Sequence, residues 1–343
     1  MFKVGIVGVG GIALRHYQGF TAAGAKVIAL ADISMDNLKK RQQEWDIAHI
    51  YTDYQDLIAR EDINAISICT PNAYHAPITL AAAKTGKHVL CEKPISMSLE
   101  DAEAMIQACE QAKVVLQIGH HMRSAAAPNY AKKLIQQGAI GDIAFVRLRQ
   151  SHDWGGAKEV RGVFGSKAHS GGGTLLDNGC HMMDLARYFA GDVEDIFARI
   201  TKAKFKNIEV EDTSVANVRF ASGALGSIEN AWTATGWEEA FWIYGTEGAL
   251  EYTNRYGNPQ LRYAFRGGGQ STWSDTDLAL YTFQDDKGHL QQEHNFISAI
   301  KGEGPIVCSG QDGLEALRLV IAAYESADKN MPITLRDITS GKL

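Results

Sequence analysis

Residues 3–13, with the sequence KVGIVGVGGIA, decide the fold of this chain. The first five are mostly apolar, and a short apolar run is typical of a buried parallel strand. The next six match the pattern G-x-G-x-x-A. Its first glycine permits a tight turn, its second lets the backbone approach a pyrophosphate, and its small third residue lets a helix pack on the strand. The helix N-terminus then offers N–H groups to phosphate. The stretch predicts a dinucleotide-binding turn made by Gly8, Gly10, Gly11, Ile12 and Ala13.

A second apolar run, residues 27–31, ends at Asp32. The dinucleotide fingerprint places an acidic residue about 20 residues beyond the glycines. A carboxylate there can accept hydrogen bonds from the ribose hydroxyls, and it repels the 2′-phosphate of NADP. The next residues are Ile33 and Ser34, so no arginine directly follows Asp32 to bind that phosphate. The sequence therefore predicts NAD rather than NADP as the cofactor.

Apolar runs and amphipathic segments alternate through the first third of the chain. We expect strands at residues 65–69, 89–91 and 114–118, and helices at residues 36–45, 74–85 and 99–112. Such alternation predicts a parallel sheet covered on both faces, with ligands at the carboxyl ends of the strands. Two of these ends carry polar residues, namely Thr70-Pro71-Asn72 with His75 and Glu92-Lys93-Pro94. These features predict a dinucleotide-binding domain over residues 1–121.

The stretch GGGTLLDNGCHMMD, residues 171–184, carries another group of polar side chains. Its three glycines lead into an expected helix over residues 174–189. Asp177, His181 and Asp184 share one face of that helix because they lie four and then three residues apart. A helix does not need such a stripe in order to fold. The stripe therefore indicates proton transfer, a metal site or a buried polar network.

Composition excludes several classes of protein. A length of 343 residues suggests two domains. The net charge of -6 and the pI of about 6.0 disfavour nucleic-acid binding. No apolar run is long enough to predict a membrane span, and the first residues lack the pattern of a signal peptide. The five scattered cysteines fit reduced thiols. We therefore expect a cytoplasmic protein with neither a nucleic-acid nor a membrane partner.

Taken in order, these motifs resemble those of the Gfo/Idh/MocA oxidoreductase family, named for glucose–fructose oxidoreductase and inositol dehydrogenase. The order is the glycine-rich turn, Thr70-Pro71-Asn72 with His75, Glu92-Lys93-Pro94, and G-G-x-x-x-D-x-G-x-H-x-x-D at residues 172–184. The resemblance covers essentially the whole chain. A glycine-rich turn alone is common, whereas Glu-Lys-Pro followed by D-x-G-x-H is far more specific.

The resemblance implies that a Rossmann domain, residues 1–121, is followed by an α+β domain, residues 122–343, built on a large open and mainly antiparallel sheet. Period-two patterns in the second half of the chain agree with this. The expected strands are residues 143–150, 195–201, 214–220, 224–232, 240–244 and 248–252, and the expected late helices are residues 291–300 and 313–326. The resemblance also implies a homodimer or homotetramer that forms through this sheet.

The resemblance further implies an NAD-dependent oxidoreductase. Such an enzyme transfers a hydride between nicotinamide and a secondary hydroxyl or ketone of a sugar, a sugar derivative or a cyclitol. The family's catalytic residues map onto Lys93, Asp177 and His181. His181 is expected to be the general acid and base, Lys93 to bond the reacting oxygen, and Asp177 to orient the substrate or the histidine. Asp184 is expected to be a structural partner of the helix.

Other residues are expected around the cofactor and the substrate. Besides the glycine-rich turn, the expected cofactor contacts are Asp32, Thr70, Pro71, Asn72, His75, Glu92 and Lys93. The candidate substrate contacts are Arg123, His152 and Trp154, and no metal ligand is expected. Trp232 and Trp237 are further candidate platforms for a sugar ring, although at least one of these tryptophans is expected in the core.

Three alternatives stand beside the dehydrogenase. A metal site could use Asp177, His181, His120 and His121, but the helix supplies only one of these histidines. A glycosidase of the same fold would oxidise a sugar transiently and eliminate its leaving group, using a cofactor that is never released. An NAD-sensing regulator would need no catalytic groups, and the joint presence of Lys93 and His181 argues against it.

Overall fold

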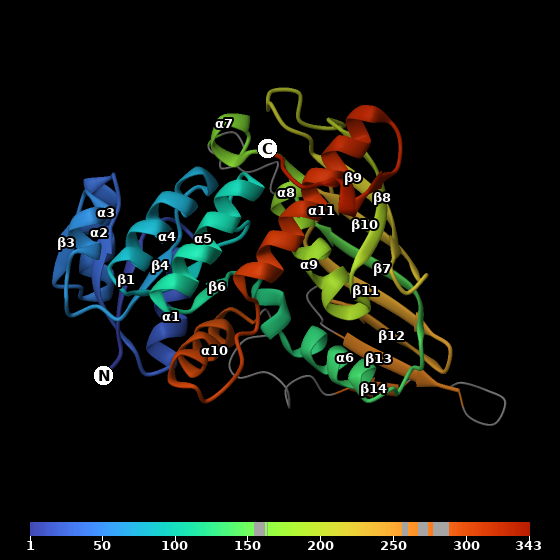
Figure 1. Cartoon of the computed structure of the whole chain (residues 1–343), viewed down its shortest axis with the longest axis horizontal. Helices are drawn as coiled ribbons and strands as arrows, with labels where there is room; N and C mark the ends of the chain where they lie inside the picture. Colours follow the sequence, from blue (N-terminus) through green and yellow to red (C-terminus); the bar gives the residue numbers. More distant parts are fainter. Residues whose placement is uncertain (154–161, 163, 256–259, 267–273, 277–287) are drawn as a thin grey trace. The chain divides into compact units, whose positions relative to one another are not determined.

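The structure is a computed structural model that describes residues 1–153, 162, 164–255, 260–266, 274–276 and 288–343 (Figure 1). It contains two compact units. The first comprises Met1–Ser124 and Phe283–Leu314, and the second comprises Ala125–Thr282 and Glu315–Leu343. Helix α11, Gly310–Lys329, runs from the first unit into the second. None of the described helices is both long and apolar enough to cross a membrane.

The first unit is built on a six-stranded sheet in the order β3-β2-β1-β4-β5-β6. Every pair of neighbouring strands is parallel. The strands are β1 Lys3–Val7, β2 Lys26–Ala31, β3 His49–Tyr51, β4 Ala65–Ile68, β5 His88–Cys91 and β6 Leu116–Ile118. From β1 the chain first adds strands on one side, β2 and β3, and then on the other, β4 to β6. Dinucleotides bind in Rossmann folds at this change of direction, between β1 and β4. The predicted Rossmann sheet is therefore confirmed.

Helices connect these strands. They are α1 Ala13–Ala22, α2 Met35–Trp45, α3 Tyr54–Ile58, η1 Asn72–Tyr74, α4 His75–Lys84, α5 Leu99–Ala112 and η2 His121–Ser124. Serine side chains begin two of the longer helices. Ser34 accepts the Asn37 N–H ahead of α2, and Ser98 accepts the Asp101 N–H ahead of α5, as N-cap serines do. Helix α5 has the bounds that the sequence predicts.

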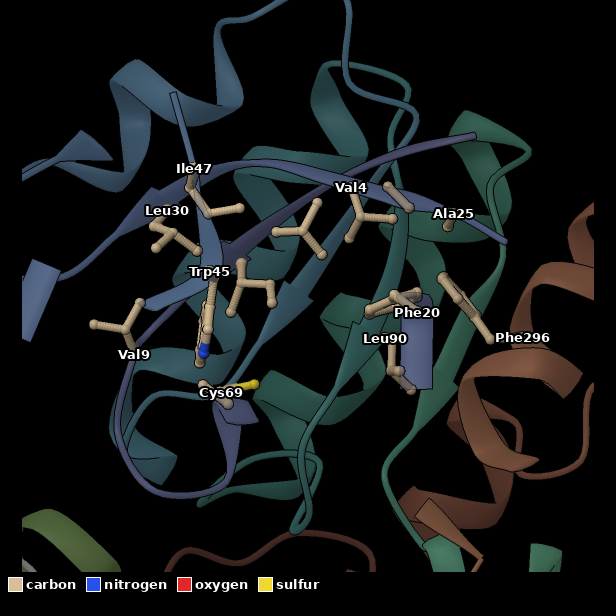
Figure 2. Packing of buried hydrophobic residues seen from close by; sticks show 14 of the residues in the cluster. Val4, Val9, Phe20, Ala25, Leu30, Trp45, Ile47, Cys69, Leu90 and Phe296 are labelled. Atoms are coloured by element: carbon tan, nitrogen blue, oxygen red, sulfur yellow. The ribbon is translucent and has the colours of Figure 1, made fainter. Parts of the chain in front are cut away.

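Helix α10, His289–Lys301, belongs to the first unit although it lies late in the chain. Its Phe296 meets Phe20 of α1 edge to face, with ring centroids 6.3 Å apart (Figure 2). The sequence-based domain boundary assigned this segment to residues 122–343. The structure corrects that assignment, because the apolar face of α10 completes a core whose other members are more than 170 residues earlier in the chain.

The second unit is built on a nine-stranded sheet in the order β14-β13-β12-β11-β7-β10-β9-β8-β15. Only the β7–β10 pair is parallel among these described strands. The strands are β7 Ile143–Ser151, β8 Val193–Thr201, β9 Thr213–Phe220, β10 Leu225–Ala231, β11 Glu238–Gly245, β12 Gly248–Thr253, β13 Gln260–Phe265, β14 Ser274–Thr276 and β15 Ile333–Thr334. The predicted α+β domain with a mainly antiparallel sheet is confirmed.

One face of this sheet is buried beneath helices of the same unit. The unit contains α6 Ala126–Gln136, α7 Lys167–Ser170, α8 Thr174–Asp177 and α9 Gly179–Ala190, with η7 Leu335–Asp337 near the C-terminus. Helices α8 and α9 pack on the central strands, as Figure 1 shows. Along β9 every second residue is buried and those between are mostly exposed. The sheet therefore positions α8 and α9 on its buried face and leaves its other face open.

Candidate active site

The glycine-rich turn after β1 has the geometry that a pyrophosphate requires. Gly8 adopts φ +85°, and a Cβ there would lie 2.6 Å from the Cys69 carbonyl oxygen, so only glycine fits. At Gly10 and Gly11 a Cβ would meet no atom within 4 Å, which leaves open space beside the backbone. Helix α1 follows with neither a side-chain cap nor an acidic residue in its first turn. Its first N–H groups can therefore receive phosphate oxygens.

Asp32 is held in place at the end of β2. Its Oδ2 accepts the Val9 N–H at 2.8 Å, and its Oδ1 accepts the Ser34 N–H at 2.8 Å. These bonds fix the carboxylate beside the glycine-rich turn. Arg41 is also close, because its Nε donates to the Val9 carbonyl oxygen at 3.4 Å while its Nη1 bonds Glu44. The contact of Asp32 with the ribose hydroxyls stays a prediction.

His75 braces two loops of the first unit. Its Nδ1 lies 2.8 Å from the Pro94 carbonyl oxygen, and its Nε2 lies 3.0 Å from the Thr70 carbonyl oxygen. The ring is fully buried, and burial lowers the pKa of His75. These contacts hold the ring between two loops, so the structure favours a bracing role for His75 over contact with the cofactor.

The Glu92 side chain also points into the protein. Its Oε1 lies 2.8 Å from Nε2 of His16, which is fully buried in α1. Its Oε2 accepts the backbone N–H of Lys93 at 3.2 Å. The sequence predicted that Glu92 would line the nicotinamide side of the cleft. The structure corrects this, because the carboxylate meets a buried imidazole instead.

Asp177 and His181 lie on one helical path in the second unit. The sequence predicts one helix here, whereas the structure has two, α8 and α9, separated by Asn178. The backbone angles of Asn178 are those of a right-handed helix, so the helical path continues through it. Asp177 ends α8, and its Oδ2 accepts the indole N–H of Trp232 at 3.3 Å. His181 lies in the first turn of α9 and is 4% exposed. Asp184 is buried one turn later, which fits a structural role.

His152 lies next to this helix. Its Nε2 is 3.0 Å from Oδ1 of Asn178, and its ring stacks on Trp237 with centroids 4.6 Å apart. The indole N–H of Trp237 donates to Glu239 at 2.8 Å. The structure therefore brings His152, Asp177 and His181 to one region of the second unit. Trp232 is fully buried in the core, and Trp154 lies outside the described residues.

Arg123 is buried within the first unit. Its guanidinium donates to Asp312 at 3.1 Å and to the Val307 carbonyl oxygen at 3.2 Å. These contacts hold the segment that leads into α11, so the structure favours a bracing role for Arg123 over contact with substrate. Among the described residues, no group of three or more His, Cys, Asp or Glu side chains could hold a metal ion.

A buried glutamate clamps the start of α8. Glu211 accepts the Leu175 N–H at 2.9 Å, the Gly173 N–H at 3.2 Å and the Tyr324 hydroxyl at 2.8 Å. A Cβ at Gly173 would collide with the Glu211 carbonyl oxygen, which explains a glycine there. The sequence analysis missed this clamp, because Glu211 and Tyr324 are far from residues 171–184 in the chain. The clamp fixes the helical turn that carries Asp177.

We expect Glu211→Ala to lower the melting temperature by about 5–10 °C. The change leaves the buried Leu175 N–H and the Tyr324 hydroxyl without their acceptor and leaves the Gly173 N–H with the Tyr324 oxygen alone, at a cost of about 2–3 kcal/mol. Differential scanning calorimetry measures the shift. Glu209→Ala is the matched control, since Glu209 accepts the Lys167 N–H at 2.7 Å at an exposed position. Equal shifts in both variants would contradict the clamp.

Comparison with known proteins agrees with this architecture. Residues 2–120 match the family model described as "Oxidoreductase family, NAD-binding Rossmann fold", and residues 129–251 match the "GFO/IDH/MocA C-terminal domain". Myo-inositol 2-dehydrogenase of Thermotoga maritima is 27% identical over 342 residues, which cover 98% of this chain and 99% of that protein. 1,5-Anhydro-D-fructose reductase of Ensifer adhaerens is 29% identical over 340 residues, covering 95% and 96% respectively.

Solved structures of similar fold are also dehydrogenases. Levoglucosan dehydrogenase in complex with NADH superposes with a TM-score of 0.87 at 25% identity, covering 97% of this chain and 99% of that one. Its complex with NADH and levoglucosan gives a TM-score of 0.87 at 26% identity, with the same coverage. Both family models and the two-unit fold agree with the motifs. The chain therefore belongs to the Gfo/Idh/MocA oxidoreductase family and carries its NAD-binding Rossmann domain.

Proposed function

We propose that this protein is an NAD-dependent dehydrogenase acting on a secondary hydroxyl of a sugar, a sugar derivative or a cyclitol. The observation that carries the proposal is the clamped α8–α9 path with Asp177 and His181, in a chain that also bears Lys93 on an NAD-binding fold. Relatives named for inositol, anhydrofructose and levoglucosan support the substrate class. A sensor protein would not need this set of acid–base groups.

In this proposal each group has one task. Bound NAD supplies the hydride acceptor. His181 removes the hydroxyl proton during oxidation and returns it during reduction, a task suited to a group whose ordinary pKa is near 6.5. Lys93 donates a hydrogen bond to the reacting oxygen and stabilises its developing negative charge. Asp177, steadied by the Trp232 indole, orients the substrate or the histidine.

A substrate panel tests the proposal. Purified protein is incubated with NAD and with aldoses, glycosides, inositols and anhydrosugars, and NADH formation is followed by absorbance. We expect net NADH with at least one class. Cleavage of nitrophenyl glycosides without added NAD and without net NADH would instead indicate the glycosidase. Failure of every sugar and cyclitol, including phosphorylated and nucleotide-linked sugars, would refute the proposal.

We expect Asp32→Ser to lower the preference for NAD over NADP by about a hundredfold in kcat/KM. The carboxylate contributes a like-charge penalty of several kcal/mol against the 2′-phosphate, and each 1.4 kcal/mol is a factor of about ten. Arg41 lies close enough to the turn to meet that phosphate. Steady-state kinetics with both cofactors measure the ratio. The control is Asp36→Ser, which removes an exposed carboxylate in the first turn of α2. An equal shift in the control would show only a general charge effect.

We also propose that the open face of the second unit's sheet forms a homo-oligomer. Leu225 and Tyr244 both pair with Phe145, one from each neighbouring strand, so the three side chains share that face. Leu225 is 53% exposed and Tyr244 is 44% exposed. Arg147 lies over the Trp242 ring on the same face and pairs with Glu229. This mixed apolar and charged surface suits a protein interface.

We expect the double variant Leu225→Glu/Tyr244→Glu to be monomeric. Two carboxylates on a desolvated apolar face have no partner, so they oppose association. Size-exclusion chromatography with light scattering measures the mass. Met331→Glu is the control, because Met331 is an exposed apolar residue of the same unit outside the sheet face. A wild-type protein that is already monomeric would refute this interface.

A further inference from the structure

A buried polar cluster lies beneath the Glu92–Lys93 segment, and we call it the His16 cluster. Its members are His16, Ser67, Glu92 and Glu293. His16 Nε2 lies 2.8 Å from Glu92 Oε1, and its Nδ1 lies 3.2 Å from Glu293 Oε1 and 2.9 Å from Ser67 Oγ. His16 and Glu293 are both 0% exposed. One imidazole is thus enclosed between two carboxyl groups.

The backbone is shaped to accommodate these side chains. A Cβ at Gly19 would collide with the Glu293 carboxyl group, and a Cβ at Gly119 would lie 2.8 Å from Glu92 Oε1. The cluster joins α1, the end of β5 and α10. Replacing buried ionic groups by apolar residues of similar volume is often neutral or stabilising, so folding alone does not explain such a cluster. This placement points to a role in the neighbouring site.

The charges in the cluster follow from their surroundings. Burial lowers the pKa of His16, but Cys69, Glu293 and Glu92 outweigh burial and leave the pKa above its ordinary value. Burial alone would raise the pKa of Glu92, yet His16 lowers it. Burial raises the pKa of Glu293 to about 8. Near pH 7 the His16 ring therefore lies between a protonated Glu293 carboxyl group and the Glu92 carboxylate.

We propose that His16 and Glu293 are positioning residues for Lys93. His16 holds the Glu92 carboxylate, whose second oxygen accepts the Lys93 N–H and so fixes the backbone from which the lysine side chain starts. Glu293 holds the other side of the imidazole ring. The inference rests on the proposed function, in which Lys93 bonds the reacting oxygen.

Loss of the Glu293 proton disturbs this arrangement. Above about pH 8 Glu293 adds a second buried negative charge, and the two carboxylates share the one His16 ring between them. The other titratable groups acting on the cluster are Cys69, Lys93 and His289. We expect the Glu92–Lys93 segment to lose its fixed position at that point, so turnover falls as Glu293 ionises.

Glu293→Gln tests the proposal, because it keeps the shape of the protonated carboxyl group and removes its titration. The kcat of the variant should equal that of the wild type near pH 7. The ratio of variant to wild-type kcat should then rise about tenfold by pH 9, since one titration with a pKa of about 8 leaves about a tenth of the groups protonated there. Glu303→Gln, the same change at an exposed position near α10, should leave the ratio at one.

Thermal stability supplies a readout that needs no activity. A carboxyl group whose pKa is raised in the folded state binds more protons there than in the unfolded state. Its contribution to the free energy of unfolding is therefore complete below the unfolded-state pKa and is lost as the pH rises through the folded-state pKa. The wild-type melting temperature should therefore fall between about pH 5 and pH 8 by more than that of Glu293→Gln. Parallel melting curves for the two proteins across this range would overturn the assigned titration.

Labelling of Lys93 separates this inference from the proposed function. Acetic anhydride modification of Lys93, measured by mass spectrometry across pH, should diverge between wild type and Glu293→Gln only above about pH 8. That divergence in a protein that forms no NADH would support the positioning role and refute the dehydrogenase. Identical labelling and parallel kcat profiles would overturn the positioning role. His16→Ala should alter labelling at every pH, and Glu293→Gln carries the test if that variant does not fold.

Discussion

The His181→Ala variant is expected to bind NAD as the wild type does and to lose kcat by a factor of about 10²–10⁴, the usual contribution of a general acid–base group. His181 lies in the first turn of α9, and its burial keeps bulk water from replacing it freely as a proton acceptor. The loss should appear in kcat, because the imidazole acts on the proton that leaves during hydride transfer. Stopped-flow measurement of NADH formation together with calorimetric titration of NAD separates the two quantities.

The matched control is His169→Ala, which removes an exposed histidine of α7 in the same unit. It should keep wild-type kcat and wild-type NAD affinity. If His181→Ala turns over at the wild-type rate, His181 is not the acid–base group. If it loses NAD binding as well as turnover, its role is in the architecture of the site and not in proton transfer.

Local sequence patterns were sufficient for most of the fold. Helix α5 was predicted with its observed bounds, and the structure shows Ser98 capping its first turn. Most strands of both sheets were predicted from short apolar runs and period-two alternation, but β13, β14 and β15 were not. The short elements β3 and α3 were not predicted, since three and five residues are too few to show a period. Helix α10 was predicted as a helix but placed in the wrong domain.

In the candidate active site, local sequence patterns do not predict the directions of all the side chains. Asp32 lies beside the glycine-rich turn, because their spacing in the chain sets this local geometry. The directions of Glu92 and His75 depend on partners from other elements, and those partners turned both side chains inward. The Glu211 clamp and the His16 cluster join segments far apart in the chain. A histidine within α1 gives no sign in the sequence that two carboxyl groups will enclose it.

The Lys93→Met variant is expected to lower kcat by about 10²–10³, the loss usual when a donor to a developing oxyanion is removed. Methionine keeps much of the length and the apolar stem of lysine, so NAD affinity and melting temperature should change little. Lys93→Arg keeps the charge but presents it in a planar fork, so it should restore only part of the lost rate. Lys84→Met, an exposed lysine at the end of α4, is the control and should leave kcat unchanged.

Combining the two substitutions tests whether both side chains serve the same step. When two residues act as a unit on one transition state, the loss of kcat in the double variant is far smaller than the product of the two single losses. The second substitution then removes a side chain that the first has already made ineffective. The His181→Ala/Lys93→Met enzyme should therefore be only slightly slower than the slower single variant. Fully multiplicative losses in kcat would show that the two groups act independently, which would contradict their joint action on one oxygen.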